Sequence, residues 1–230
     1  MAYFPFFMDM EQMKGLVIGG GVVASRKIRL LLPFEADLHV VAAEALPELV
    51  QLAQEGRIHL SVRKFDWNDL EGMDYVVAAS SDEALNRSVS ERCKERRIPI
   101  NVVDVKEECS FIFPSLVQDG CITAGISTGG NSPYLAKYLK QRVREAIPEG
   151  IGQTADMLGA FRPMVKERIK SQKVREQIFT ELAELVLGGV AGVDAIEAAA
   201  GVDAAKPREL TEAEVEAVIQ KHVKNNAQIG

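Results

Sequence analysis

The stretch KGLVIGGGVVASRKIRLLL (residues 14–32) constrains the fold more than any other part of the chain. A short apolar run that ends in three glycines and continues at helical spacing is typical of a β-strand joined to an α-helix by a tight turn. Gly19, Gly21 and Ala24 match G-x-G-x-x-A, the spacing of turns that hold a dinucleotide pyrophosphate. The first glycine turns the chain, the second lets the backbone approach the phosphates, and the small third residue allows close helix–strand packing. We predict a dinucleotide site, with a bare strand-to-helix turn as the alternative.

The rest of the first hundred residues alternates between apolar runs and amphipathic segments. Strand-like runs occupy 36–42, 59–65, 74–80 and 98–104. Strand–helix alternation at this spacing predicts an α/β fold, a parallel sheet with helices on both faces. Ser80 and Glu83 have capping-box spacing, so we expect the third helix to begin at Ser80.

The pattern changes after residue 104. Two β-type runs within 111–127 are split by Asp119-Gly120, a strong hairpin signal. A helix should follow, with Ser132 as its N-cap and Pro133 at its first position.

From about residue 149 the sequence is helical in pattern. Helices are predicted at 151–170, 173–187 and 211–224, the last with a capping box of Thr211 and Glu214. The Ala/Gly-rich stretch 187–210 is expected to be a loosely packed connection.

Composition limits the partners. A net charge of −6 over 230 residues argues against nucleic acid. The apolar N-terminus lacks the basic region of a signal peptide, and no run approaches the roughly 18 apolar residues of a membrane helix. Cys93, Cys109 and Cys121 lie far apart, so neither a disulfide framework nor a thiolate metal site is expected. We expect a soluble, cytoplasmic protein with no membrane partner.

The ribose of a bound dinucleotide is usually held by an acidic residue about 20 positions after the glycines. Here Val41 and Ala42 occupy the end of the strand, and the first acidic residue, Glu44, lies two positions beyond it. The ribose is therefore expected to meet backbone groups around Ala43 and the Glu44 carboxylate. No arginine stands beside them in sequence to bind a 2′-phosphate, which favours NAD over NADP.

Other polar residues are candidates for substrate chemistry. Asp104 is the first carboxylate after the fifth strand, where it could act as a general base or merely cap a turn. The segment ISTGGNSP (126–133) is either a second anion site or a loop with a helix cap. Arg26 and Lys27 are expected to be solvated or to face a substrate. His39, His59 and His222 show no metal-ligand spacing, so no resident metal is predicted.

Five segments, in order and spacing, resemble the precorrin-2 dehydrogenase family, the dehydrogenase/ferrochelatase module of siroheme synthesis. They are GGGVVASRKIRLLL (19–32), VVAASSDEALNRSV (76–89), INVVD (100–104), FIFPSLV (111–117) and ISTGGNSPYLAKYLK (126–140). The opening YFPFFMDM (3–10) also resembles that family, and the resemblance covers residues 1 to about 150.

The resemblance implies oxidation of precorrin-2 to sirohydrochlorin by NAD+ and, in some members, later insertion of Fe2+. It also implies a homodimer formed through the segment after the Rossmann domain. The expected organisation is a Rossmann-type NAD-binding domain (1–113), a small α+β dimerisation and substrate segment (114–148) and a C-terminal helical domain (149–230). A chain of 230 residues has no room for the methyltransferase domain of some relatives, so a separate protein should make precorrin-2.

The resemblance further implies site residues. Asp104 matches the family's essential aspartate. The cofactor would meet Gly19, Gly20, Gly21, Val22 and Val23 at the pyrophosphate, Ala43 and Glu44 at the ribose, Ala79 and Ser80 above it, and Asn101 near the nicotinamide. The tetrapyrrole substrate would meet Ser127, Thr128, Gly129, Gly130 and Asn131, with Lys137 in a basic cluster (Lys140, Arg142, Arg144) suited to its carboxylates.

Two other functions remain open on the sequence. An NAD(H)-sensing Rossmann module would explain the glycine turn but would leave NVVD, FIFPS and STGGNSP without a purpose. A chelatase or carrier with a vestigial nucleotide site would insert metal without NAD. Chelation needs no permanent metal, since the porphyrinoid is the ligand, so the sequence leaves ferrochelatase activity undecided.

Overall fold

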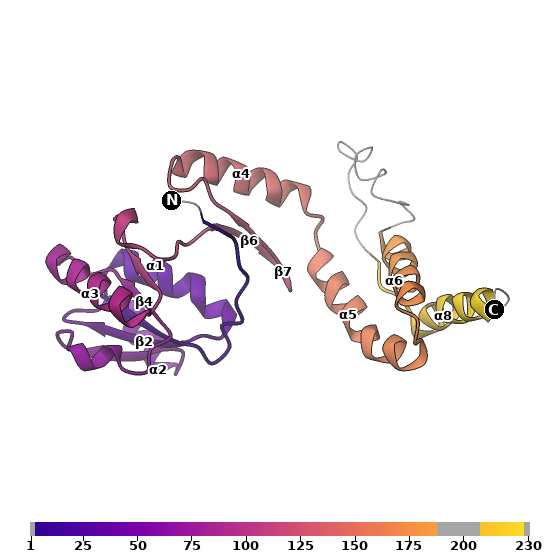
Figure 1. Cartoon of the computed structure of the whole chain (residues 1–230), viewed down its shortest axis with the longest axis horizontal. Helices are drawn as coiled ribbons and strands as arrows, with labels where there is room; N and C mark the ends of the chain where they lie inside the picture. Colours follow the sequence, from indigo (N-terminus) through magenta and orange to yellow (C-terminus); the bar gives the residue numbers. More distant parts are fainter. Residues whose placement is uncertain (1–2, 188–207, 228–230) are drawn as a thin grey trace. The chain divides into compact units, whose positions relative to one another are not determined.

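The computed structural model describes residues 3–187 and 208–227 (Figure 1). The chain divides into two compact units, Met1–Pro114 and Ser115–Gly230. The further division of the second unit at residue 148 stays a prediction. No helix in the described part of the chain is long and apolar enough to span a membrane.

A five-stranded parallel sheet forms the centre of the first unit. Its strands are β1 (Lys14–Ile18), β2 (Asp37–Ala42), β3 (His59–Val62), β4 (Tyr75–Ala78) and β5 (Ile100–Val102). They lie in the order β3-β2-β1-β4-β5, and every neighbouring pair is parallel. The order reverses between β1 and β4, the point at which such sheets bind ligands beyond their carboxyl ends. The Rossmann-type α/β prediction is confirmed.

Helices cover both faces of this sheet. On one face α1 (Val22–Leu31) and α2 (Pro47–Gln54) contribute Ile28 and Leu49 to the buried core. On the other, α3 (Glu83–Arg96) contributes Val89. The central strands are apolar on both sides because both faces are covered. This unit also contains short 3-10 helices, labelled η1 (Leu32–Phe34), η2 (Trp67–Leu70) and η3 (Lys106–Glu108).

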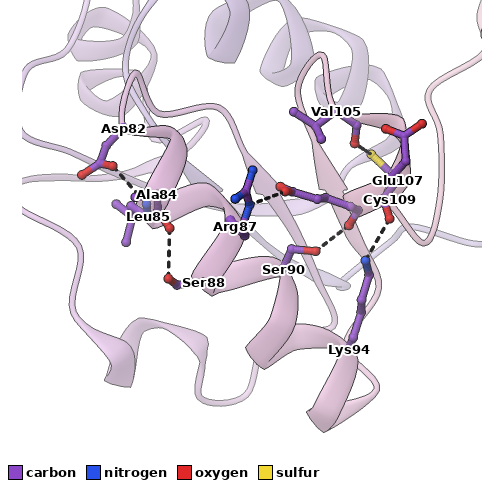
Figure 2. Close-up of polar contacts among 11 residues, drawn as sticks. Asp82, Ala84, Leu85, Arg87, Ser88, Ser90, Lys94, Val105, Glu107 and Cys109 are labelled. Carbon is purple, nitrogen blue, oxygen red and sulfur yellow. Dashed lines mark hydrogen bonds and ion pairs between the residues drawn. The ribbon is translucent and has the colours of Figure 1, made fainter.

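The prediction that α3 begins at Ser80 is wrong. Asp82 is the N-cap, and its side chain accepts a hydrogen bond from the Leu85 amide at 3.0 Å (Figure 2). Ser80 stays in the preceding loop, where its Oγ accepts from the Asp82 amide at 3.0 Å. Its backbone is also held by the buried Asn86 side chain, which donates to the Ser80 carbonyl at 2.9 Å and accepts from its amide at 3.3 Å. This contact between residues six positions apart holds Ser80 in the loop, and the helix starts two residues later than predicted.

The second unit begins with the predicted hairpin, formed by β6 (Ser115–Asp119) and β7 (Ile122–Ile126). Asp119 pairs with Ile122, so the turn residues are Gly120 and Cys121, one position later than the Asp119-Gly120 signal indicated. Helix α4 (Pro133–Ala146) follows, and Ser132 caps it as predicted by accepting from the Leu135 amide at 3.2 Å.

Among the described residues of the second unit, α4 is followed by α5 (Ile151–Arg168), α6 (Gln172–Val186) and α8 (Glu212–Ala227). Val165, Ile178 and Ile219 belong to their common core. The predicted capping box forms, since the Glu214 amide donates to Thr211 Oγ1 at 3.3 Å and the Thr211 amide donates to the Glu214 carboxylate at 2.8 Å. Most of the Ala/Gly-rich stretch 187–210 lies outside the described residues.

The first turn of α5 lies directly against the hairpin turn. A Cβ at Gly152 would overlap the Asp119 carbonyl and lie 2.8 Å from the Gly120 amide nitrogen. The Gly152 amide donates to the Asp119 carboxylate at 3.3 Å. Glycine is therefore required at residue 152 by close backbone approach. Gly159 of the same helix has open space around its Cβ position within the described structure.

Gly152→Ala should lower the free energy of unfolding by about 1–3 kcal/mol, because overpacking would force the hairpin turn away from α5. Gly159→Ala is the matched control, and should raise stability by about 0.5–1 kcal/mol through better helix propensity. Urea unfolding followed by circular dichroism measures both. Equal effects of the two substitutions would contradict the packing argument.

Candidate functional site

The turn between β1 and α1 lies at the carboxyl edge of the sheet, between the loops that follow β2 and β4. A Cβ at Gly19, whose φ is +123°, would lie 2.7 Å from the Ala79 carbonyl carbon. A Cβ at Gly20 would lie 2.8 Å from Cα of Ala45 and would overlap the Glu44 carbonyl. The fold therefore brings three of the predicted cofactor segments together, and both glycines are required for that approach.

Gly21 differs from its two neighbours. A Cβ there would meet nothing within 4 Å among the described residues, and its φ of −86° suits any amino acid. Neither packing nor backbone conformation within the described chain accounts for a glycine at this position. A phosphate group lying against the backbone would account for it, because it needs the space that a side chain would fill.

The amino end of α1 offers hydrogen-bond donors beside that space. Gly21 is the N-cap, no side chain of the described residues caps the helix, and its first turn has no acidic residue. The first intrahelical hydrogen bond of α1 is donated by the Ser25 amide to the Gly21 carbonyl, at 3.0 Å. The N–H groups of Val22, Val23 and Ala24 thus precede the intrahelical ladder and can bind an anion.

The loop after β2 carries the predicted ribose residues. Ala43 and Glu44 are both exposed, and this loop is tied to the glycine turn by the Leu46 amide, which donates to the Gly20 carbonyl at 3.0 Å. Glu48 in α2 accepts hydrogen bonds from Ser25 and Arg29 in α1. Helices α1 and α2 are therefore held together next to the turn.

An arginine that the sequence spacing did not indicate lies near this loop. Arg63 follows β3, and its amide donates to the Ala42 carbonyl at 2.9 Å. Its guanidinium binds both carboxylate oxygens of Asp69, at 2.8 and 2.5 Å. The hydrogen bonds to Asp69 raise the pKa of Arg63 and lower that of Asp69. The arginine whose backbone binds the end of β2 thus already has a carboxylate partner.

Asp104 lies in the turn after β5, with its side chain exposed. Its φ is +61°, in the left-handed region that residues other than glycine rarely adopt. Gln12, Glu35 and Arg97 share this conformation. Glu35 and Arg97 end helices, where it is common, whereas Gln12 and Asp104 lie in turns. Aspartate is one of the residues that tolerate this conformation best, so the turn is compatible with the side chain at residue 104.

The segment after Asp104 is bound to α3 (Figure 2). Arg87 pairs with the Glu108 carboxylate at 2.9 Å, and the Ser90 hydroxyl donates to the Glu108 carbonyl at 2.6 Å. Lys94 donates to the Glu107 carbonyl at 3.1 Å. These contacts hold one side of the turn, while the Asp104 carboxylate stays open to solvent.

Cys109 closes the same turn from inside. Its buried sulfur accepts from the Val102 amide at 3.2 Å and lies 3.2 Å from the Val105 carbonyl oxygen (Figure 2). Burial raises the pKa of this thiol, so it keeps the proton that it donates. The sequence identified Cys109 only as a free thiol, because nothing local marks such a contact.

Lys27 of α1 interacts electrostatically with the Asp104 carboxylate. Its ammonium lies 4.1 Å from the centre of the Phe113 ring. Burial lowers the pKa of Lys27, while the negative charge of Asp104 acts in the opposite direction. Arg26 is exposed, as expected, whereas Lys27 is half-buried.

Asn101 is buried in β5, and its amide nitrogen donates to the Phe111 carbonyl at 3.0 Å. This bond fixes the segment that carries Phe113, and so indirectly supports Lys27. Proximity of Asn101 to a nicotinamide stays a prediction, as do the cofactor contacts of Ala79 and Ser80. Nothing in the sequence indicated that the Asn86 side chain would bind the Ser80 backbone.

The segment 126–133 belongs to the second unit and forms a closed loop. Thr128 Oγ1 accepts from the Ser132 amide at 3.2 Å and donates to the Ser132 carbonyl at 3.0 Å. Ser127 Oγ accepts from the Gly129 amide at 3.1 Å. The Ser127 and Thr128 hydroxyls thus stabilise the loop that precedes α4. The substrate roles of Ser127, Thr128, Gly129, Gly130, Asn131 and Lys137 stay predictions.

Known proteins resemble this chain over most of its length. A family model described as "Putative NAD(P)-binding" matches residues 6–115. The siroheme synthase of Thioalkalivibrio sulfidiphilus is 41% identical over 184 residues, covering 80% of this chain and 38% of that protein. Siroheme synthase 1 of Serratia proteamaculans is 39% identical over 171 residues, covering 74% and 36%.

The chain spans less than half the length of these curated relatives. The solved structure of SirC, precorrin-2 dehydrogenase, has the same fold: its TM-score is 0.68 at 21% identity, covering 96% of this chain and 100% of that one. The relatives, the family model and the fold all point to the same kind of protein as the glycine turn and the segment around Asp104. The chain is similar to the siroheme synthases over most of its own length, and its first unit matches the NAD(P)-binding family model.

Proposed function

We propose that this protein oxidises precorrin-2 to sirohydrochlorin with NAD+. The observation that carries the proposal is the open space at Gly21 beside the uncapped end of α1, at the same edge of the sheet as Asp104. The names of the relatives, siroheme synthase and precorrin-2 dehydrogenase, support this substrate. The three free cysteines fit a reducing cytoplasm.

The oxidation removes a hydride and a proton from the substrate. NAD+ supplies the hydride acceptor, so the protein has to hold NAD+ and the substrate in the geometry that hydride transfer requires. The N–H groups of Val22 and Val23 would bind the pyrophosphate, and Ala43 with Glu44 would meet the ribose. NAD is favoured over NADP because the guanidinium of Arg63 is already bound to Asp69.

Asp104 is proposed as the base that accepts the proton. Its carboxylate is exposed on a turn that is anchored to α3, so it can meet a proton of a bound substrate. Lys27 would attract a carboxylate of the tetrapyrrole.

The second unit carries further candidates for binding the carboxylates of the substrate. Arg142 already pairs with Glu145 at 3.0 Å, and Arg144 donates to the Gln118 carbonyl at 3.3 Å. Exposed Lys137 therefore remains the better partner for a substrate carboxylate, next to the loop of Ser127 and Thr128.

We also propose a homodimer formed through α4. Within the described chain no residue of this helix is buried. Its large apolar side chains are exposed by 77, 51, 53 and 43%, at Tyr134, Leu135, Tyr138 and Leu139. An apolar stripe of this kind on a surface helix is typical of an interface.

Gly21→Ala should weaken NAD+ binding at least about tenfold, or about 1.4 kcal/mol, because the methyl group would occupy the phosphate space. The cofactor-free protein should keep its melting temperature within a few degrees, since no described residue contacts that methyl group. Gly20→Ala is the contrasting variant, and should lower the melting temperature through overlap with Glu44. Unchanged NAD+ affinity in Gly21→Ala, measured by calorimetry, would refute the site.

Asp104→Asn should lower the rate of NADH formation from precorrin-2 and NAD+ by about 10²- to 10⁴-fold, as expected on loss of a general base. Asparagine tolerates the left-handed backbone, so the turn should persist. Glu107→Gln, an exposed carboxylate in the same loop, is the control. The assay is anaerobic and follows NADH absorbance and the ring spectrum together.

This assay also separates the alternatives. NAD+ binding without NADH formation by the unmodified protein would favour an NAD(H)-sensing module. Metal insertion is tested as a separate step. Fe2+ is added after NADH formation stops, and the ring spectrum is followed.

Tyr138→Glu combined with Leu135→Glu should convert a dimer to a monomer, because two charges would be buried in an apolar interface. Val223→Glu in α8 replaces a side chain of similar exposure (41%) outside α4, and should leave the dimer intact. Sedimentation velocity gives the masses. A monomeric unmodified protein would overturn the proposed interface.

A further inference from the structure

His39 and His59 lie side by side on neighbouring strands, although 20 positions separate them in sequence. They are direct partners in the parallel pairing of β2 and β3. Their rings stack with centroids 4.7 Å apart and planes 24° from parallel. Both side chains therefore project from the same face of the sheet, and their outer nitrogens can reach a common point.

Asp37 brings a carboxylate to that point. It precedes His39 by two positions in β2, so both side chains share one face. An Asp37 carboxylate oxygen lies 3.3 Å from Nε2 of His39 and 3.2 Å from Nε2 of His59. All three potential ligand atoms lie within 4.8 Å of one another.

The separations of the Asp37 oxygen from the two histidine nitrogens suit a tetrahedral metal ion. Bonds of about 2.0–2.1 Å from Zn2+ to histidine nitrogen and carboxylate oxygen place neighbouring ligands about 3.3 Å apart. Nε2 of His39 is shielded from solvent and, within the described residues, makes no hydrogen bond of acceptable geometry, despite its approach to Asp37. A buried nitrogen without such a partner is costly, and a metal bond would satisfy it.

We propose that Asp37, His39 and His59 bind a divalent transition-metal ion of the zinc class, with water as the remaining ligand. Two imidazoles and one carboxylate suit this class, whereas Mg2+ and Ca2+ prefer oxygen ligands throughout. His59 is 69% exposed on the edge strand β3, so an ion can enter from solvent.

The site lies at the amino-terminal ends of β2 and β3, whereas the glycine turn follows the carboxyl end of β1. An ion there would not contact the proposed cofactor. Instead it would link the edge strand to its neighbour, and would stabilise the folded state because the ligands converge only in that state. This inference is independent of the proposed oxidation.

Zn2+ titrated into the chelator-treated full chain should bind at one ion per chain by calorimetry and raise the melting temperature. Co2+ should give the visible absorption of a tetrahedral site. His59→Gln, a change at an exposed side chain, should weaken Zn2+ binding at least tenfold and abolish the thermal shift. His222→Gln and Cys121→Ser are controls for the remaining histidine and the exposed thiol, and should bind as the unmodified protein does.

Asp37→Asn provides a second variant, and the melting temperature of each variant in EDTA shows that it folds. Absence of Zn2+ binding by the unmodified chain overturns the proposal. So does binding that survives both His59→Gln and Asp37→Asn, or that is lost only in Cys121→Ser or His222→Gln.

Discussion

The close approach of three loops at the carboxyl edge of the sheet is possible only because Gly19 and Gly20 have no side chains. A Cβ on either residue would overlap backbone of the loop after β4 or after β2. This contact sets where α1 begins, and therefore where its free N–H groups point. The space at Gly21, the position of Glu44 and the link between α1 and α2 all depend on it.

Asp104 depends on a second set of contacts, made behind it. Arg87, Ser90 and Lys94 bind the segment of Glu107 and Glu108, and Cys109 closes the turn from inside. The Asp104 side chain is exposed, on a backbone in the left-handed conformation. This anchoring suits the role that is proposed for Asp104, because enzymes gain much of their rate by holding reacting groups in one geometry.

Features with a local cause were predictable. The strands of the sheet are buried on both faces, so they form continuous apolar runs, and the caps at Ser132 and Thr211 involve residues only three positions apart. The start of α3 was not predictable from Ser80 and Glu83, because the buried Asn86 side chain binds the Ser80 backbone and leaves Asp82 as the cap. Two N-cap residues were available within three positions, and the hydrogen bonds of the buried Asn86 favour the second.

The sequence by itself determined the alternation of strands and helices, the glycine turn and the candidate base Asp104, since each rests on the conformational preferences of a few consecutive residues. Only the tertiary structure decided which distant side chains meet. The register of β2 and β3 brings His59 to Asp37, folding of the segment after β3 commits Arg63 to Asp69, and the return of the chain after β5 places Cys109 under its own turn. The reason is physical: such contacts depend on strand register and packing, which are properties of the whole sheet and leave no pattern in neighbouring residues.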